Sequence, residues 1–128
     1  MLDNIKKLSQ VLSNTFNAKD IVNVLSEYFV QNFGISSLDI YVFDDTTKSL
    51  RDFARNWLYI EEICDKQTTG QLYSYFEVLC YKVHVEENKF LYYGLHKGTK
   101  LIGMLKMDVS FIDTENLIKF LEYGSYII

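Results

Sequence analysis

The chain of 128 residues is 48% hydrophobic and 23% charged, which is the composition of one globular domain and argues against a disordered segment. Its net charge is −4 and Lys6-Lys7 is its only pair of adjacent basic residues, so we expect no nucleic-acid partner. No apolar run approaches the roughly 20 residues that cross a bilayer, and the first residues lack signal-peptide features, so we expect a cytoplasmic protein.

Two amphipathic helices are predicted in the first third of the chain. The first covers residues 4–14, where apolar residues recur at spacings of three and four. The second covers residues 18–33, with Asn17 as its N-cap and Gly34 as its left-handed end. Its apolar stripe consists of Ile21, Val24, Leu25, Tyr28, Phe29 and Phe33.

From Leu38 the hydrophobic period changes from 3.6 to 2, which predicts a hairpin. Its strands are expected at residues 38–43 and 50–57, with a polar turn at residues 44–48 between them. Residues 58–70 fit either a longer strand or a short helix near residues 60–64. A central helix follows at residues 70–80, with Thr68 or Thr69 as its expected cap.

The C-terminal third is predicted to be a three-stranded meander and a final helix. Strands are expected at residues 82–86, 90–95 and 100–109, joined by tight turns. Asp113 or Thr114 would cap the final helix, which carries Leu117, Phe120 and Leu121. The sequence closes on Tyr126-Ile127-Ile128, and an apolar end of this kind predicts either an excised piece of a longer protein or a helix that is meant to continue.

Three segments support a family resemblance. Residues 38–48 resemble the first strand and acidic turn of a GAF domain, and residues 91–107, with their Ile-Gly-Met-Leu pattern, resemble its paired late strands. Residues 111–117 resemble the opening of its last helix. With the order helix, helix, hairpin, helix, meander, helix, the chain resembles a GAF domain over nearly its whole length, and a PAS-like sensor is the nearest alternative.

The resemblance implies an α+β fold with a central antiparallel sheet of five or six strands. The terminal helices would pack on one face, and the central helix with its loops on the other. Residues 1–128 would form one GAF-like domain of a signalling protein. Its role would be regulatory and not enzymatic, with no cofactor, and a kinase, cyclase or phosphodiesterase effector domain is expected in the full-length protein.

The first functional hypothesis is an aromatic-lined pocket enclosed by the central helix and the sheet face away from the terminal helices, since ligand pockets are mostly apolar with a few placed polar groups. Arg55 is the most informative candidate, because strand alternation would place it between Phe53 and Trp57. It would either clamp an anionic group or lie along the aromatic surface and stack on Trp57. The full set of expected ligand-binding residues is Tyr41, Phe43, Phe53, Arg55, Trp57, Tyr73, Phe76 and Tyr92.

The second hypothesis is a dimerising connector with a filled pocket. Where many GAF domains carry a Gly-rich segment near the ligand pocket, the stretch from Cys64 to Cys80 holds only Gly70. Two terminal helices laid side by side would form a homodimer with a second copy. The alternative is that their apolar residues cover the sheet. The expected interface consists of Leu8, Val11, Leu12, Ile118, Tyr123 and Ile127.

Other chemistry has little support in the sequence. His84, His96 and the two cysteines form no ligand pair with metal-site spacing, so no metal is expected. Cys64 and Cys80 resemble the thiols of the GAF-fold free methionine sulfoxide reductases only in number and approximate region, which leaves a redox enzyme as a distant alternative. Asn88-Lys89-Phe90 matches part of a cyclic-nucleotide motif, but Leu91 departs from it.

Overall fold

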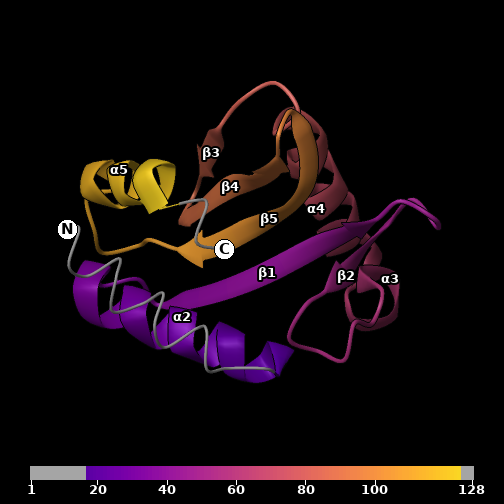
Figure 1. The fold of residues 1–128 in the computed structure, drawn as a ribbon, viewed down its shortest axis with the longest axis horizontal. Coiled ribbons are helices and arrows are strands. Elements are labelled where there is room, and N and C mark those ends of the chain that lie inside the picture. Colours follow the sequence, from indigo (N-terminus) through magenta and orange to yellow (C-terminus); the bar gives the residue numbers. More distant parts are fainter. Residues whose placement is uncertain (1–16, 125–128) are drawn as a thin grey trace.

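A five-stranded antiparallel sheet in the order β2-β1-β5-β4-β3 forms the centre of the molecule (Figure 1). The computed structural model describes residues 17–124, so the helix predicted at residues 4–14 lies outside the described part. The predicted α+β class and antiparallel sheet are confirmed, with five strands. The elements are α2 (Ala18–Phe33), β1 (Ser37–Asp44), β2 (Ser49–Asp52), α3 (Ile60–Ile63), α4 (Lys66–Val78), β3 (His84–Glu87), β4 (Phe90–Lys97), β5 (Lys100–Asp108) and α5 (Glu115–Gly124).

The two ends of α2 are fixed by the residues that the sequence indicates. The side chain of Asn17 accepts a hydrogen bond from the backbone N–H of Lys19 at 2.8 Å, which satisfies a free donor of the first turn. Gly34 adopts a φ of 78° and donates its N–H to the carbonyl of Val30 at 3.0 Å. The range predicted for this helix is therefore confirmed.

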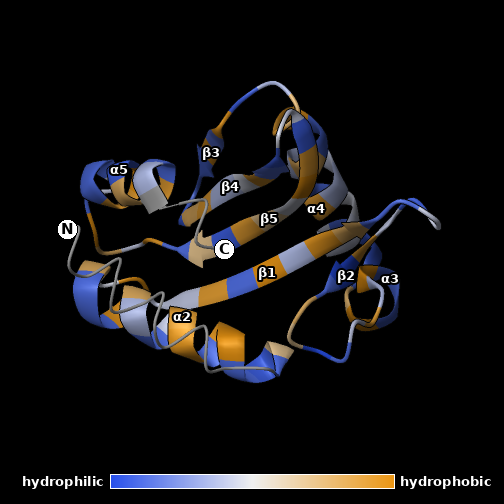
Figure 2. Cartoon of the chain, viewed as in Figure 1, coloured by the Kyte–Doolittle hydropathy of each residue, from blue (hydrophilic) through white to orange (hydrophobic). Residues whose placement is uncertain are grey.

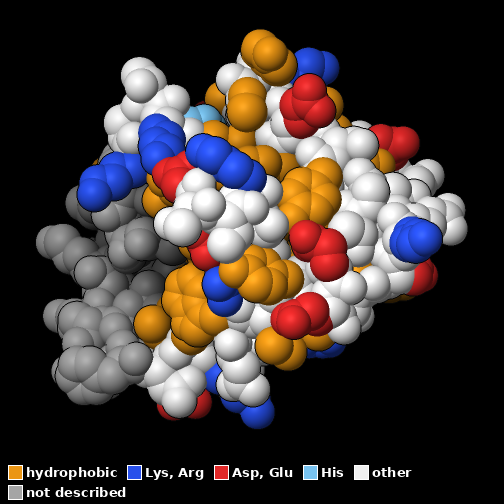
Figure 3. Space-filling model, turned by 90° about the vertical axis from the view of Figure 1, so that its right-hand side faces the viewer, with side chains coloured by type: hydrophobic (Ala, Val, Ile, Leu, Met, Phe, Trp, Pro, Cys, Tyr) orange, Lys and Arg blue, Asp and Glu red, His pale blue; other side chains and the backbone are white. Residues whose placement is uncertain are grey.

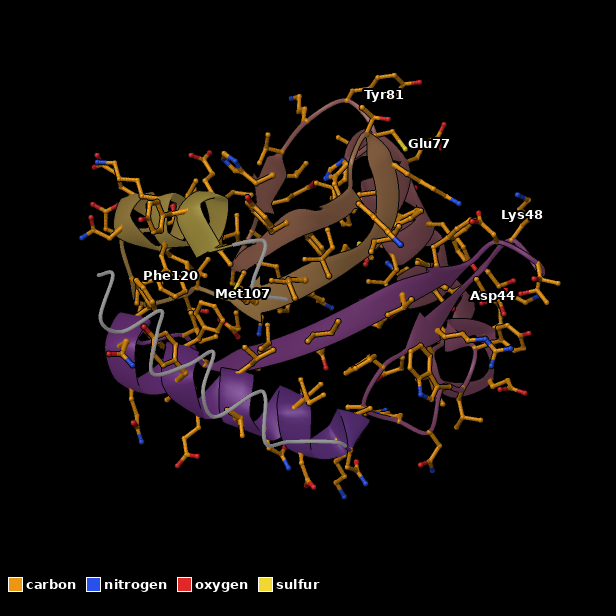
Figure 4. All side chains as sticks on the ribbon, viewed as in Figure 1. Asp44, Lys48, Glu77, Tyr81, Met107 and Phe120 are labelled. Atoms are coloured by element: carbon orange, nitrogen blue, oxygen red, sulfur yellow. The ribbon has the colours of Figure 1, made fainter. Side chains whose placement is uncertain are left out.

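The side chains of β1 divide between two hydrophobic clusters, one on each face of the sheet. Leu38 and Ile40 pack with α2 and α5, whereas Tyr41 and Phe43 face α4. Figure 2 shows hydrophobic residues recurring along α2 and β1, as two such packed faces require. In Figure 4, Phe120 of α5 points into the space between α5 and α2. The arrangement of the described helices on the two faces thus agrees with the prediction.

The second strand is shorter than predicted, ending at Asp52 instead of residue 57. The buried carboxylate of Asp52 accepts hydrogen bonds from the N–H groups of Ala54 and Arg55, which bends the chain into a turn. Asn56 and Trp57 then adopt φ angles of 54° and 59°. Residues 53–57 therefore form a loop, although the sequence predicts a strand there. After the loop the chain comes back beside the end of β2, where the N–H of Asp52 donates to the carbonyl oxygen of Leu58 at 2.9 Å.

The central helix begins earlier than predicted. Asp65, and not Thr68 or Thr69, is its N-cap, and the Asp65 side chain accepts from the N–H of Thr68 at 2.7 Å. The first turn of α4 is polar, so no apolar stripe marks it in the sequence. The ambiguous stretch before it forms the single turn of α3.

The late strands are joined by a two-residue turn and pass very close to β1. Lys97 pairs with Lys100, so Gly98 and Thr99 form the turn, and Gly98 has a φ of 63°. Gly103 pairs with Val42, and a Cβ atom at Gly103 would lie 2.4 Å from the carbonyl oxygen of Tyr41. The glycine of the Ile-Gly-Met-Leu pattern is therefore required by the approach of two backbones.

Candidate functional site

A pocket of about 430 Å³, open to solvent, lies where β1 and β2 meet the loop of residues 53–57. Val42, Asp44, Arg51 and Trp57 line it. Val42 and Arg51 are direct partners across the hairpin and lie on the face of the sheet that carries Leu38 and Ile40. Figure 3 looks onto this end of the molecule, where acidic, basic and hydrophobic side chains are interspersed.

Arg51 is held in the pocket wall by three different elements. Its Nε donates to Asp44 Oδ2 at 3.0 Å, and its Nη1 donates to the carbonyl oxygen of Trp57 at 2.7 Å. Its Nη2 donates to the hydroxyl of Tyr59 at 2.5 Å, and the guanidinium lies 4.0 Å from the centre of that ring. The guanidinium therefore ties β1, the loop and the start of α3 together.

Asp44 supplies a fixed negative charge. The hydrogen bond from Arg51 is the main cause that lowers the pKa of the Asp44 carboxyl below its ordinary value, so this group is ionised at neutral pH. Its other oxygen accepts from the N–H groups of Thr46 and Thr47 and closes the β1–β2 turn. Figure 4 shows Asp44 and Lys48 at this turn, at the far end of β1.

Trp57 has an unusual backbone for a large side chain. Its φ of 59° lies in the left-handed region, which bulky residues rarely adopt, and its side chain remains 41% exposed. The indole and the Phe53 ring form a T-shaped contact, with ring centres 5.0 Å apart. Residues with backbone conformations of this kind cluster at functional sites, so Trp57 is a candidate functional residue.

Most of the predicted aromatic residues lie on the other face of the sheet. Phe43 stacks on Phe76 at 5.1 Å, and Tyr92 stacks on Tyr75 at 4.1 Å. Side chains of this kind fill the space between the sheet and α4, so the pocket predicted in this space is replaced by a packed cluster. The members of the predicted set found there are Tyr41, Phe43, Tyr73, Phe76 and Tyr92.

The other three predicted residues lie on or beside the 53–57 loop. Phe53 packs against the cluster under α2, and Trp57 lines the pocket. The side chain of Arg55 is 65% exposed, with its Nε 3.9 Å from the carboxylate of Asp52. The guanidinium that faces the pocket is that of Arg51, which is absent from the predicted set. The Asp44–Arg51 pair follows from hairpin register, since residues 44 and 51 are diagonal neighbours once residues 42 and 51 pair.

A group of titratable side chains lies on the α4 face, around Asp39. Burial raises the pKa of the Asp39 carboxyl above its ordinary value, and the nearby Asp52 charge adds to this effect. The cations of Lys106 and Arg55 oppose it. Burial also raises the pKa of the Tyr41 hydroxyl. The ionised form of Asp39 therefore destabilises the folded state at neutral pH.

Replacing Asp39 with asparagine is expected to raise the free energy of unfolding at pH 7, because the variant keeps the shape of the neutral acid. A carboxyl whose pKa is raised on folding favours the folded state increasingly as pH falls from its folded pKa towards its unfolded pKa. The advantage of the Asp39→Asn variant should therefore shrink on acidification to the ordinary aspartate range. Thermal unfolding of both proteins between pH 7 and pH 3.5 tests this, and an advantage that does not change with pH would contradict it.

The two cysteines lie at opposite ends of α4. The 13 residues of that helix place them about 20 Å apart, too far for a disulfide without rearrangement. Burial raises the pKa of the Cys64 thiol, which disfavours the reactive thiolate. This placement gives the redox alternative no support.

Residues 17–124 hold neither a candidate metal site nor a candidate membrane span. Their His, Cys, Asp and Glu side chains form no group of three or more that would hold a metal ion. None of the helices in this range combines the length and apolar character needed to cross a membrane.

The sequence matches no protein-family model and no curated protein. Among solved structures, the GAF domain of an Acinetobacter phosphoenolpyruvate-protein phosphotransferase is similar at a TM-score of 0.60 and 15% identity, over 98% of this chain and 88% of the other. The GAF domain of the potassium sensor histidine kinase KdpD from Escherichia coli gives 0.65 and 11%, over 99% and 89%. Residues 122 to 287 of a methyl-accepting chemotaxis protein give 0.58 and 10%, over 94% and 91%. The fold is therefore GAF-like, as the sequence analysis predicts.

Proposed function

We propose that this chain is a regulatory, non-catalytic sensory module of a signal-transduction protein, and that a small molecule binds in the pocket beside Trp57. The similar folds come from a phosphotransferase, a sensor histidine kinase and a chemotaxis protein, and the names of the last two denote signalling. Two of them are single domains of larger proteins. Residues 1–128 would likewise be one domain that regulates an attached effector such as a kinase, cyclase or phosphodiesterase.

The observation that carries the proposal is the composition of the pocket wall. Val42 and Trp57 supply apolar surface, while Asp44 and Arg51 supply polar groups that neighbouring contacts hold in place. Small-molecule sites combine these two features. The pocket also touches the loop and, through Tyr59, the start of α3, so a ligand would change contacts in several elements at once.

A thermal-shift screen against a metabolite library tests this function. At a ligand concentration of 100 times Kd, binding to the folded state alone adds about 2.7 kcal/mol to its stability, which is a readily measured rise in Tm. The rise should be lost in a Trp57→Leu variant and kept in a Tyr81→Ser variant. Tyr81 is 87% exposed, and Figure 4 shows it at the top of the molecule, away from the turn on the right that carries Asp44. A library without a Trp57-dependent stabiliser would contradict the proposal.

A dimerising connector is the second candidate, because large aromatic side chains at both ends of α5 remain exposed. Phe111, just before the helix, is 88% exposed, and Tyr123 in its last turn is 47% exposed. Ile118, by contrast, packs against the core under α2. The remaining predicted interface residues, Leu8, Val11, Leu12 and Ile127, lie outside the described range.

If the chain is a connector, light scattering at high micromolar concentration should give the mass of a dimer, twice 15.1 kDa. A Tyr123→Ser variant should then dissociate at concentrations at least about tenfold higher than the parent, as expected for the loss of a buried aromatic anchor. A Tyr81→Ser variant serves as the exposed-tyrosine control. A monomer at every concentration would exclude this role for residues 1–128.

A further inference from the structure

We propose that the pocket beside Trp57 recognises a flat, uncharged ring that carries a carboxamide or lactam group. This inference rests on the proposed function and names the chemical class of its ligand. The ring would lie against the indole of Trp57 and the side chain of Val42. The amide edge would meet Arg51 through its carbonyl oxygen and Asp44 through its N–H.

The ring preference follows from how Trp57 is held. The backbone of Trp57 keeps its left-handed φ while its carbonyl accepts from Arg51 Nη1, and the Phe53 ring makes a T-shaped contact with the indole. The indole is therefore fixed, although it is 41% exposed in the pocket wall. A fixed aromatic side chain and an aliphatic side chain in the wall of one pocket, those of Trp57 and Val42, favour a flat apolar ring.

The charge preference follows from the ion pair. Asp44 and Arg51 carry opposite charges 3.0 Å apart, so they nearly cancel within the pocket. The nearby Asp45 is likewise paired, with Lys100 and, at 3.8 Å, with Lys48. A ligand anion would face the carboxylate of Asp44, and a ligand cation would face the guanidinium of Arg51. An uncharged ligand avoids both repulsions.

The preference for an amide group on the ligand follows from the hydrogen bonds that Asp44 and Arg51 can still make. A guanidinium has five N–H donors, and within the described residues three of those of Arg51 point to Asp44, Trp57 and Tyr59. Two donors are left on the terminal nitrogens. Asp44 Oδ2 accepts from Arg51 and keeps a second lone pair. A neighbouring donor and acceptor of this kind match the N–H and C=O of one amide group.

Benzamide, benzoate and benzamidinium provide the test, because they share one shape and differ in charge. Trp57 is the only tryptophan, so a single indole N–H cross-peak in a nitrogen-15 NMR spectrum reports on the pocket. We expect benzamide to shift this peak saturably, with a Kd of about 1 mM for so small a molecule. Benzoate and benzamidinium should bind at least about fivefold more weakly.

Variants at Trp57 and Asp44 separate the contributions of the indole and of the carboxylate to ligand binding, and a variant at Tyr81 is the control. Trp57→Leu should weaken benzamide binding at least about tenfold, followed through the amide peaks of Val42 and Asp44. Asp44→Asn should remove the repulsion between a ligand anion and the Asp44 carboxylate. Benzoate should then bind this variant as tightly as benzamide does, or more tightly. Tyr81→Ser should change nothing, since Tyr81 lies far from the pocket. If the Trp57 variant does not fold, the Asp44→Asn result still tests whether the pocket prefers an uncharged ligand.

Other outcomes overturn the inference. These are an unmoved indole peak with benzamide, tighter binding of either charged analogue to the parent protein, or shifts confined to the α4 face near Tyr92. The proposed function is judged separately by the metabolite screen. A library ligand of another class that moves the indole peak would leave the sensory role intact and refute only the amide class.

Discussion

Replacing Phe29 with alanine is expected to lower the free energy of unfolding by about 4 kcal/mol, the usual cost of removing a fully buried phenylalanine. Phe29 is 1% exposed and lies where α2, α5 and the sheet meet. Its ring contacts Phe33 at 5.7 Å and Phe120 of α5 at 5.6 Å between ring centres. The alanine variant would leave a cavity between two helices that these rings hold together.

Val30→Ala is the matched control for that variant, because Val30 is the next residue of α2 and is 44% exposed. Its unfolding free energy should stay within about 0.5 kcal/mol of the parent value, as for most surface substitutions. Urea unfolding followed by circular dichroism gives both numbers. A loss below 1 kcal/mol for Phe29→Ala would mean that α2 does not pack on the sheet as described.

Gly103→Ala is expected to cost about 3 kcal/mol, at the upper end of the usual range for overpacking. The new Cβ would lie 2.4 Å from the carbonyl oxygen of Tyr41 and 3.4 Å from Cα of Val42. Both are backbone atoms of β1, so no side-chain rotation relieves the clash. The pairing of β1 with β5 at the centre of the sheet would have to shift.

Gly70→Ala is the control here and should act in the opposite direction. Gly70 lies inside α4, and a Cβ atom there would meet nothing within 4 Å. Alanine is favoured over glycine in a helix by roughly 1 kcal/mol, so this variant should be more stable than the parent. Equal effects of the two substitutions in urea unfolding would contradict the close approach of β1 and β5.

The sequence predicts the ends of helices and strands well where a single residue, such as a cap, determines where the element begins or ends. Asn17 and Gly34 mark the ends of α2, and the change of period at Leu38 marks β1. The same reasoning failed at Asp52, whose buried carboxylate turns the chain while the residues after it still alternate. It also missed the start of α4, because a polar first turn carries no apolar stripe.

The candidate site is harder to predict from the sequence than the fold, because it depends on which residues are neighbours across the hairpin. The alternation at residues 53–57 predicts a strand on which Arg55 lies between Phe53 and Trp57. The structure gives these residues a loop conformation and brings Arg51 to the pocket instead. The register of the hairpin would have identified Asp44 and Arg51 as diagonal neighbours. The left-handed backbone of Trp57 had no signal in the sequence, since only the surrounding contacts impose it.

The indole N–H peak of Trp57 offers the most direct test of ligand sensing, recorded while the small-molecule fraction of a cell extract is added to the labelled chain. The sensory role predicts that this peak shifts together with the amide peaks of Val42 and Asp44. In the Trp57→Leu variant, the same addition should leave those amide peaks unshifted. An indole peak that remains unmoved at every extract concentration would contradict the account.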